Sequence, residues 1–185
     1  VLIAVWLGRQ RSMSADAGRA VLRELQQLPN KAAQILSRSS LLAALAEKYA
    51  GYHNFFYLGR MYNWPTALEG ALKLKEISYA HAEVLAAGEI KHGPIALITK
   101  QFPAIVIAPT DSVYEKMIAT IYELKARNGI ILAIAMEGNG EIERIADDTF
   151  FIPQTIPMLA PILAVIPLQL FAYHVARVRG CDIDK

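Results

Sequence analysis

The sequence has 185 residues, of which 54% are hydrophobic and 19% are charged, so it can bury a sizeable core and is not a disordered chain. Its formal net charge of +2 is too small to indicate a nucleic-acid-binding protein. The single cysteine, Cys181, excludes an internal disulfide and is typical of a cytoplasmic protein.

The first residues, VLIAVWL, are apolar but do not form a targeting signal. They are too few for a signal peptide and lack both a basic flank and a cleavage site. We therefore expect residues 1–12 to be the end of the last helix of a preceding domain, and the chain to be part of a longer protein.

Residues 13–50 show helical spacing in short pieces and indicate a helical connector. Pro29 is expected to separate the first two pieces, because a proline inside a helix removes a backbone hydrogen bond. The expected N-caps are Ser14, Asn30 and Ser39.

After residue 50 the pattern changes to alternating strands and helices. The expected strands are the apolar runs at 54–60, 104–109, 129–136 and 149–153, with 81–86 as a further short strand candidate. The expected helices are 65–80, 112–127, 140–146 and 159–179. Because most of these strands read as continuous apolar runs and alternate with helices, we predict an α/β fold: a three-layer α/β/α domain with a parallel sheet of about five strands, preceded by connector helices. Ligands of such sheets bind beyond the carboxyl ends of the strands, which points to the loops after Gly59, at 85–94 and at 109–112.

Residues 149–176 carry no Asp, Glu, Lys or Arg, as in a membrane span. Four prolines interrupt them, at positions 153, 157, 161 and 167. We therefore predict a short buried strand followed by a buried helix, and no membrane association.

Glu69, Lys73 and Glu76 are spaced i, i+4 and i+7, so they project from one face of the expected helix. In one interpretation this is a solvated face, with Thr66 and Glu69 as a capping box and Glu69–Lys73 as an ion pair. In the other, the carboxylate moves a proton between adjacent sugar carbons while the ammonium stabilises the developing enediolate oxygen. Spacing alone leaves both open.

His92 precedes Gly93–Pro94, a typical helix stop. There the imidazole can simply complement the helix dipole, or it can protonate a ring oxygen and open a cyclic sugar.

The sequence around the other histidines does not match a metal-binding motif. His81 and Glu83 match the H-x-E part of a zinc-deaminase pattern, but no P-C-x-x-C follows. His53 and His174 are interpreted as structural. No phosphate-binding glycine motif occurs, and we expect neither a metal nor an organic cofactor.

The run ALEGALKLKEISYAHAEVLAAGEIKHGPIALI closely resembles the second SIS (sugar isomerase) domain of the glutamine–fructose-6-phosphate aminotransferase family. The segment IPLQLFAYHVARVRGCDIDK resembles the part of that family just before its C-terminal tail. The resemblance implies that residues 51–185 form a second SIS domain without this tail, and that residues 1–12 end a first one.

The family transfers ammonia from glutamine to fructose 6-phosphate and isomerises the product to glucosamine 6-phosphate. By resemblance, Glu76 is the base that moves the proton between C1 and C2, and Lys73 is its catalytic neighbour. His92 is the histidine that reaches the active site of the other subunit of a homodimer and assists ring opening. Glu69 and Arg60 match further motif positions and are expected to bind substrate or support the site.

The resemblance also implies that several parts of the enzyme lie outside these 185 residues. They are the glutaminase domain, the phosphate-binding loop of the first SIS domain, and a tail lysine. We therefore expect the chain alone to be inactive. Two alternatives stay open: a non-catalytic phosphosugar-binding SIS module of a transcriptional regulator, and a related sugar-phosphate deaminase or deglycase.

Overall fold

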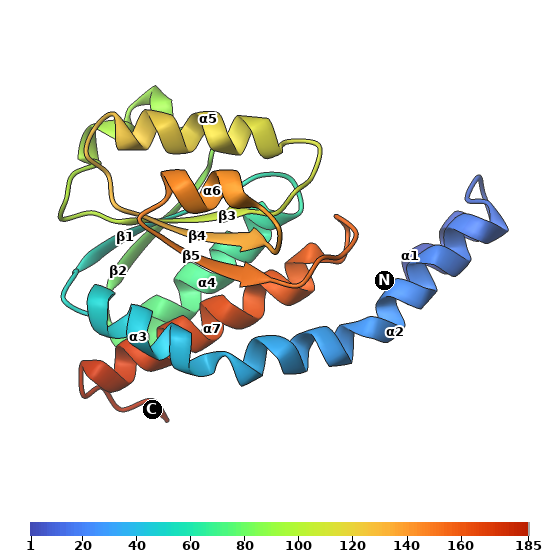
Figure 1. Ribbon diagram of the computed structural model, residues 1–185, viewed down its shortest axis with the longest axis horizontal. Coiled ribbons are helices and arrows are strands. Elements are labelled where there is room, and N and C mark those ends of the chain that lie inside the picture. Colours follow the sequence, from blue (N-terminus) through green and yellow to red (C-terminus); the bar gives the residue numbers. More distant parts are fainter. Residues whose placement is uncertain (185) are drawn as a thin grey trace.

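The computed structural model describes residues 1–184 and contains a parallel five-stranded sheet in the order β2-β1-β3-β4-β5 (Figure 1). The strands are β1 (Asn54–Gly59), β2 (His81–Ala86), β3 (Ala104–Ala108), β4 (Ile131–Met136) and β5 (Asp148–Ile152). All five expected strands are confirmed. Because β2 and β3 pair with opposite sides of β1, the order of the strands reverses at β1. Ligands of open α/β sheets bind at such a reversal.

Helices cover both faces of the sheet and give the predicted three layers (Figure 1). One face is covered by α3 (Ser39–Tyr49), α4 (Asn63–Ser78) and α7 (Ala160–Val178), and the other by α5 (Tyr114–Lys125) and α6 (Gly140–Ile145). Because each strand alternates its side chains between the faces, the sheet separates two hydrophobic clusters.

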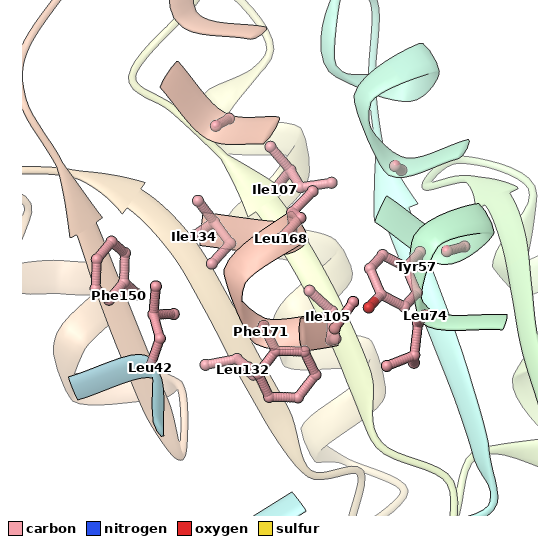
Figure 2. Packing of buried hydrophobic residues seen from close by; sticks show 14 of the residues in the cluster. Leu42, Tyr57, Leu74, Ile105, Ile107, Leu132, Ile134, Phe150, Leu168 and Phe171 are labelled. Carbon is pink, nitrogen blue, oxygen red and sulfur yellow. The ribbon is translucent and has the colours of Figure 1, made fainter. Parts of the chain in front are cut away.

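The larger cluster lies between the sheet and α7. Figure 2 shows Leu168 and Phe171 of α7 beside Ile105, Leu132 and Ile134 of the central strands. All five side chains are almost fully buried. Burial of each contributes about 1.5–3 kcal/mol, so this cluster fixes α7, and the helices packed on it, to the sheet.

α7 is the one helix among residues 1–184 that is long and apolar enough to cross a bilayer. Its buried side chains face the larger cluster, and it packs along both α4 and α3. Its apolar character is therefore explained by its place in the core.

The N-terminal part is helical, as predicted, but the expected break at Pro29 is wrong. After α1 (Leu2–Arg9), α2 runs unbroken over Ala15–Ser37 with Pro29 inside it, and its first half extends away from the sheet (Figure 1). Leu28 and Ile35 belong to the same cluster as α7, so packing offsets the lost backbone hydrogen bond.

Of the predicted N-caps, one is confirmed. The hydroxyl of Ser14 accepts a hydrogen bond from the backbone N–H of Ala17 at 3.1 Å. Asn30 lies inside α2, and Ser39 is the first residue of α3 rather than its cap. The hydroxyl of Ser39 instead lies 2.9 Å from Nε2 of His174 on α7, a long-range contact that local spacing does not reveal.

The turn between β1 and α4 is tight. A Cβ at Gly59 would lie 2.2 Å from the backbone oxygen of Asn63, so only glycine fits without moving the backbone. This turn fixes where α4 starts and hence where its side chains lie.

Candidate active site

α4 presents Glu69, Lys73 and Glu76 on one solvent-facing side, as their spacing predicts. The helix begins beyond the carboxyl end of β1 and ends before His81, the first residue of β2. Its sixteen residues span about 24 Å. Lys73 and Glu76 therefore lie toward the amino ends of the strands, away from the carboxyl-end loops where the sequence placed the expected ligand site.

The ion pair on this face joins Lys73 to Glu76 rather than to Glu69. Nζ of Lys73 lies 2.6 Å from Oε2 of Glu76, and the two side chains are 35% and 47% exposed. The hydrogen bond to Glu76 raises the pKa of Lys73, with smaller Coulombic contributions from Glu76 and Glu69 opposed by desolvation. The side chain at position 73 is thus held as a cation beside a carboxylate.

Glu69 has a different partner, and the predicted capping box is wrong. Oε1 of Glu69 accepts a hydrogen bond from Nε2 of Gln169 on α7 at 3.3 Å. α4 begins three residues before Thr66, so the hydroxyl of Thr66 lies inside the helix and donates to the backbone oxygen of Tyr62 at 3.4 Å. The start of α4 is set by the turn at Gly59 rather than by a side-chain cap.

His92 ends a short 3₁₀ helix, η1 (Ile90–His92), and is exposed. Gly93 follows with φ of 143°, a conformation that favours glycine, and a second 3₁₀ helix, η2 (Pro94–Leu97), comes next. The predicted helix stop is confirmed, although the turn that it ends is 3₁₀ and not α-helical. The imidazole of His92 lies at the exposed end of this segment, whose first residue, Ile90, is buried.

Glu76 and His92 lie beyond opposite ends of β2. Glu76 precedes the strand, His92 follows it, and its six residues span roughly 16 Å. This distance greatly exceeds the separation of neighbouring atoms in a sugar. The two groups of one chain are therefore not brought together.

Arg60 follows β1 at the carboxyl edge and is also remote from Lys73 and Glu76. Its guanidinium lies against Gly88, where a Cβ would be 3.1 Å from Nη1. Arg60 thus packs against the loop after β2 and does not lie near the face of α4 that carries Lys73 and Glu76.

Of the two histidines interpreted as structural, His174 lies partly buried on α7, whereas His53 is exposed and its structural role stays a prediction. His174 contacts Ser39, and burial, with a contribution from Arg177, lowers its pKa. Within residues 1–184, no three His, Cys, Asp or Glu side chains lie close enough to hold a metal ion.

Residues 48–179 match the SIS domain family. The chain belongs to the SIS domain family. Known proteins similar to this SIS domain include glutamine–fructose-6-phosphate aminotransferases (isomerizing) from Thermus thermophilus, at 48% identity over 185 residues, and Chlorobaculum tepidum, at 49% over 184. Each alignment covers 100% of this chain but only 31% and 30% of those relatives, so the chain spans about a third of their length.

Solved structures give the same assignment of fold. The C-terminal domain of glucosamine-fructose-6-phosphate aminotransferase from Francisella tularensis superposes with a TM-score of 0.92 at 29% identity, covering 99% of this chain and 52% of that one. A glucosamine-6-phosphate deaminase from Thermotoga maritima has a TM-score of 0.67 at 22% identity over 96% of this chain and 49% of its own, which shows the fold alone.

Two residues of this SIS domain that sequence reasoning missed support α4. Gln169 interrupts the apolar sequence of α7 and meets Glu69. Arg179 donates hydrogen bonds to the backbone oxygens of Ala50 and Ser78, each at 2.9 Å, and also to that of Tyr52. The one polar position within IPLQLF is the only local signal for Gln169, and no local signal marks Arg179.

Proposed function

We propose that the chain is the second SIS domain of a glutamine–fructose-6-phosphate aminotransferase, which converts fructose 6-phosphate and glutamine-derived ammonia to glucosamine 6-phosphate. The observation that carries the proposal is the Lys73–Glu76 pair on the open face of α4. The alignment over the whole chain with aminotransferases supports it.

Glu76 is the base of the proposed isomerisation. After ammonia condenses at C2 of the open-chain sugar with loss of water, the carboxylate removes a proton from C1 and leaves an enolamine. The same proton returns to C2. The proton of the C1 hydroxyl is transferred through solvent to the imine nitrogen, so that C1 becomes a carbonyl and the nitrogen becomes the amine of the product. The ammonium of Lys73, kept charged by Glu76, stabilises negative charge that develops on the oxygen. This route needs no metal and no organic cofactor.

His92 acts in the partner copy of a homodimer, where it protonates the ring oxygen and opens the cyclic sugar. Two observations support action in the partner. His92 is exposed at the end of η1, and β2 separates it from Glu76 of its own chain. The dimer contact therefore decides whether its imidazole reaches a bound sugar.

Glu69 supports the site by linking α4 to α7 through Gln169. Residues 1–12 end the preceding SIS domain, residues 13–50 connect the two, and residues 51–185 form the second, in a cytoplasmic enzyme. A glutaminase domain supplies the ammonia, and the loop that binds the sugar phosphate comes from the first SIS domain.

The test is Glu76→Gln in the full-length enzyme. We expect glucosamine 6-phosphate formation to fall by about 10²–10⁴-fold, because the proton acceptor is gone, while glutamine hydrolysis continues. Glu47→Gln, which changes an exposed carboxylate on α3, is the matched control. Isomerisation that survives in Glu76→Gln would show that another group is the base.

Two other functions predict different outcomes. A non-catalytic module of a regulator would bind sugar phosphate equally well with or without the carboxylate of Glu76, and would form no product. A deaminase or deglycase would release ammonia or free sugar without consuming glutamine. Only the aminotransferase couples loss of glutamine to formation of the amino sugar.

A further inference from the structure

A hollow of about 380 Å³ lies at the carboxyl ends of β1 and β2, on the side of the sheet that α5 covers. Its walls come from three segments: Arg60 after β1, the loop after β2, and the side of α5 that faces this loop. The lining residues are Arg60, Ala87, Gly88, Lys91, Lys116, Ala119, Thr120 and Glu123. Lys73 and Glu76 do not line it, so it is separate from the candidate active site.

Arg60 forms the inner wall of this hollow and has no anionic partner among residues 1–184. Its Nε is shielded from solvent and donates no hydrogen bond within this part of the chain. Among the same residues, no carboxylate lies within 4 Å of its guanidinium. A half-buried cation with an unpaired N–H is costly, and a bound anion would remove that cost.

Two exposed lysines add positive charge to the rim. Lys91 comes from η1 and Lys116 from α5, and Glu123 is the only carboxylate from the described residues that lines the hollow. Three cations against one carboxylate give a local excess of positive charge, which concentrates anions. The flat fork of a guanidinium together with lysine ammonium groups is the usual protein environment of a phosphate group.

The floor of the hollow leaves room for a ligand. Ala87 and Thr120 are buried, and the Thr120 hydroxyl donates to the backbone oxygen of Lys116 at 3.0 Å. Gly88 adds no side chain, and a Cβ there would lie 3.1 Å from Arg60. The volume is at the lower end of the range for small-molecule sites.

We propose that this hollow binds the phosphate group of a small phosphorylated metabolite. Arg60 and Lys116 hold the phosphate oxygens from opposite walls, and Lys91 closes the site from the loop. Because Lys91 precedes His92, the bound phosphate links the segment that carries His92 to α5. The site goes beyond the proposed function and does not depend on the roles of Lys73 and Glu76.

The test is titration calorimetry of the full-length protein with inorganic phosphate at low ionic strength. We expect Lys116→Gln to weaken binding about tenfold, the loss of one charge-assisted contact, and Arg60→Gln to weaken it further. Lys100→Gln is the matched control, since Lys100 is exposed in the turn before β3, at the amino ends of the strands. It should leave the affinity unchanged.

Hydrogen exchange locates the bound phosphate. Exchange of the backbone amides of residues 87–93 should slow with phosphate in the wild type and not in Lys116→Gln. Equal phosphate affinity in Lys116→Gln and Lys100→Gln, or no protection of residues 87–93, would overturn the proposal. Both variants change exposed side chains, and their melting temperatures check that the fold is intact.

Competition experiments identify the kind of molecule that carries the phosphate group. Fructose 6-phosphate and a nucleoside diphosphate, each tested in competition with inorganic phosphate, show whether a sugar phosphate or a nucleotide binds more tightly. Glu76→Gln separates this proposal from the preceding one. If both are correct, that variant loses isomerisation and keeps phosphate-dependent protection of residues 87–93.

Discussion

Nζ of Lys73 lies 2.6 Å from Oε2 of Glu76, one turn apart on the open face of α4. The pair places a proton acceptor beside a fixed positive charge, while Glu69, on the same face, is turned to Gln169 of α7. One face of one helix therefore carries both an ion pair and a structural link to the core.

The first prediction concerns the charge of Lys73. The hydrogen bond to Glu76 raises its pKa, so the ammonium persists below that raised pKa and is lost only as the pH rises through it. In Glu76→Gln the pKa of Lys73 should fall toward its ordinary value, as measured by NMR titration of labelled lysine. Glu69→Gln should lower it less, because Glu69 contributes least. An unchanged pKa in Glu76→Gln would contradict the contact.

The second prediction tests the partner role of His92. Glu76→Gln and His92→Gln enzymes should each be impaired in isomerisation. When the two are unfolded, mixed and refolded together, the mixed dimer regains one complete site, with Glu76 of one chain and His92 of the other. For random mixing, about a quarter of wild-type activity should return. If both residues acted within one chain, mixing would restore nothing.

The third prediction compares two buried tyrosines. The hydroxyl of Tyr57 is buried without a hydrogen-bond partner among residues 1–184, whereas that of Tyr49 donates to Asp148 at 2.7 Å. Burial accordingly raises the pKa of Tyr57. Tyr57→Phe should leave the free energy of unfolding unchanged or raise it by about 1 kcal/mol. Tyr49→Phe should lower it by about 1–3 kcal/mol in denaturant titrations, since it removes a bond to a charged group. Equal losses would show that Tyr57 has a bound water as partner.

The fourth prediction concerns Arg179, which holds the ends of α3 and α4 and the loop before β1 through backbone oxygens. Arg179→Met should lower the free energy of unfolding by about 2–4 kcal/mol, because buried carbonyl oxygens lose their donors. Arg127→Met, at an exposed position after α5, is the control and should change little. Equal effects of the two substitutions would contradict a specific role for Arg179.

Much of the fold could be predicted because its signals are local. Strands β3 and β4 are buried on both faces, so their sequences are continuously apolar and stand out. The predicted helix boundaries were wrong where tertiary packing overrides local sequence preference. α2 continues through Pro29 because Leu28 and Ile35 pack in the larger cluster, and α4 begins early because the turn at Gly59 sets its first residue.

The sequence by itself determined which residues share a helix face, since 3.6 residues per turn place Glu69, Lys73 and Glu76 on one side whatever surrounds them. Only the tertiary structure decided their partners. The packing of α4 on α7 brings Gln169 to Glu69, which frees Lys73 for Glu76. The path of β2 likewise carries His92 away from that pair, because the distance between two groups beyond opposite ends of a strand is set by the strand and not by their spacing in the sequence.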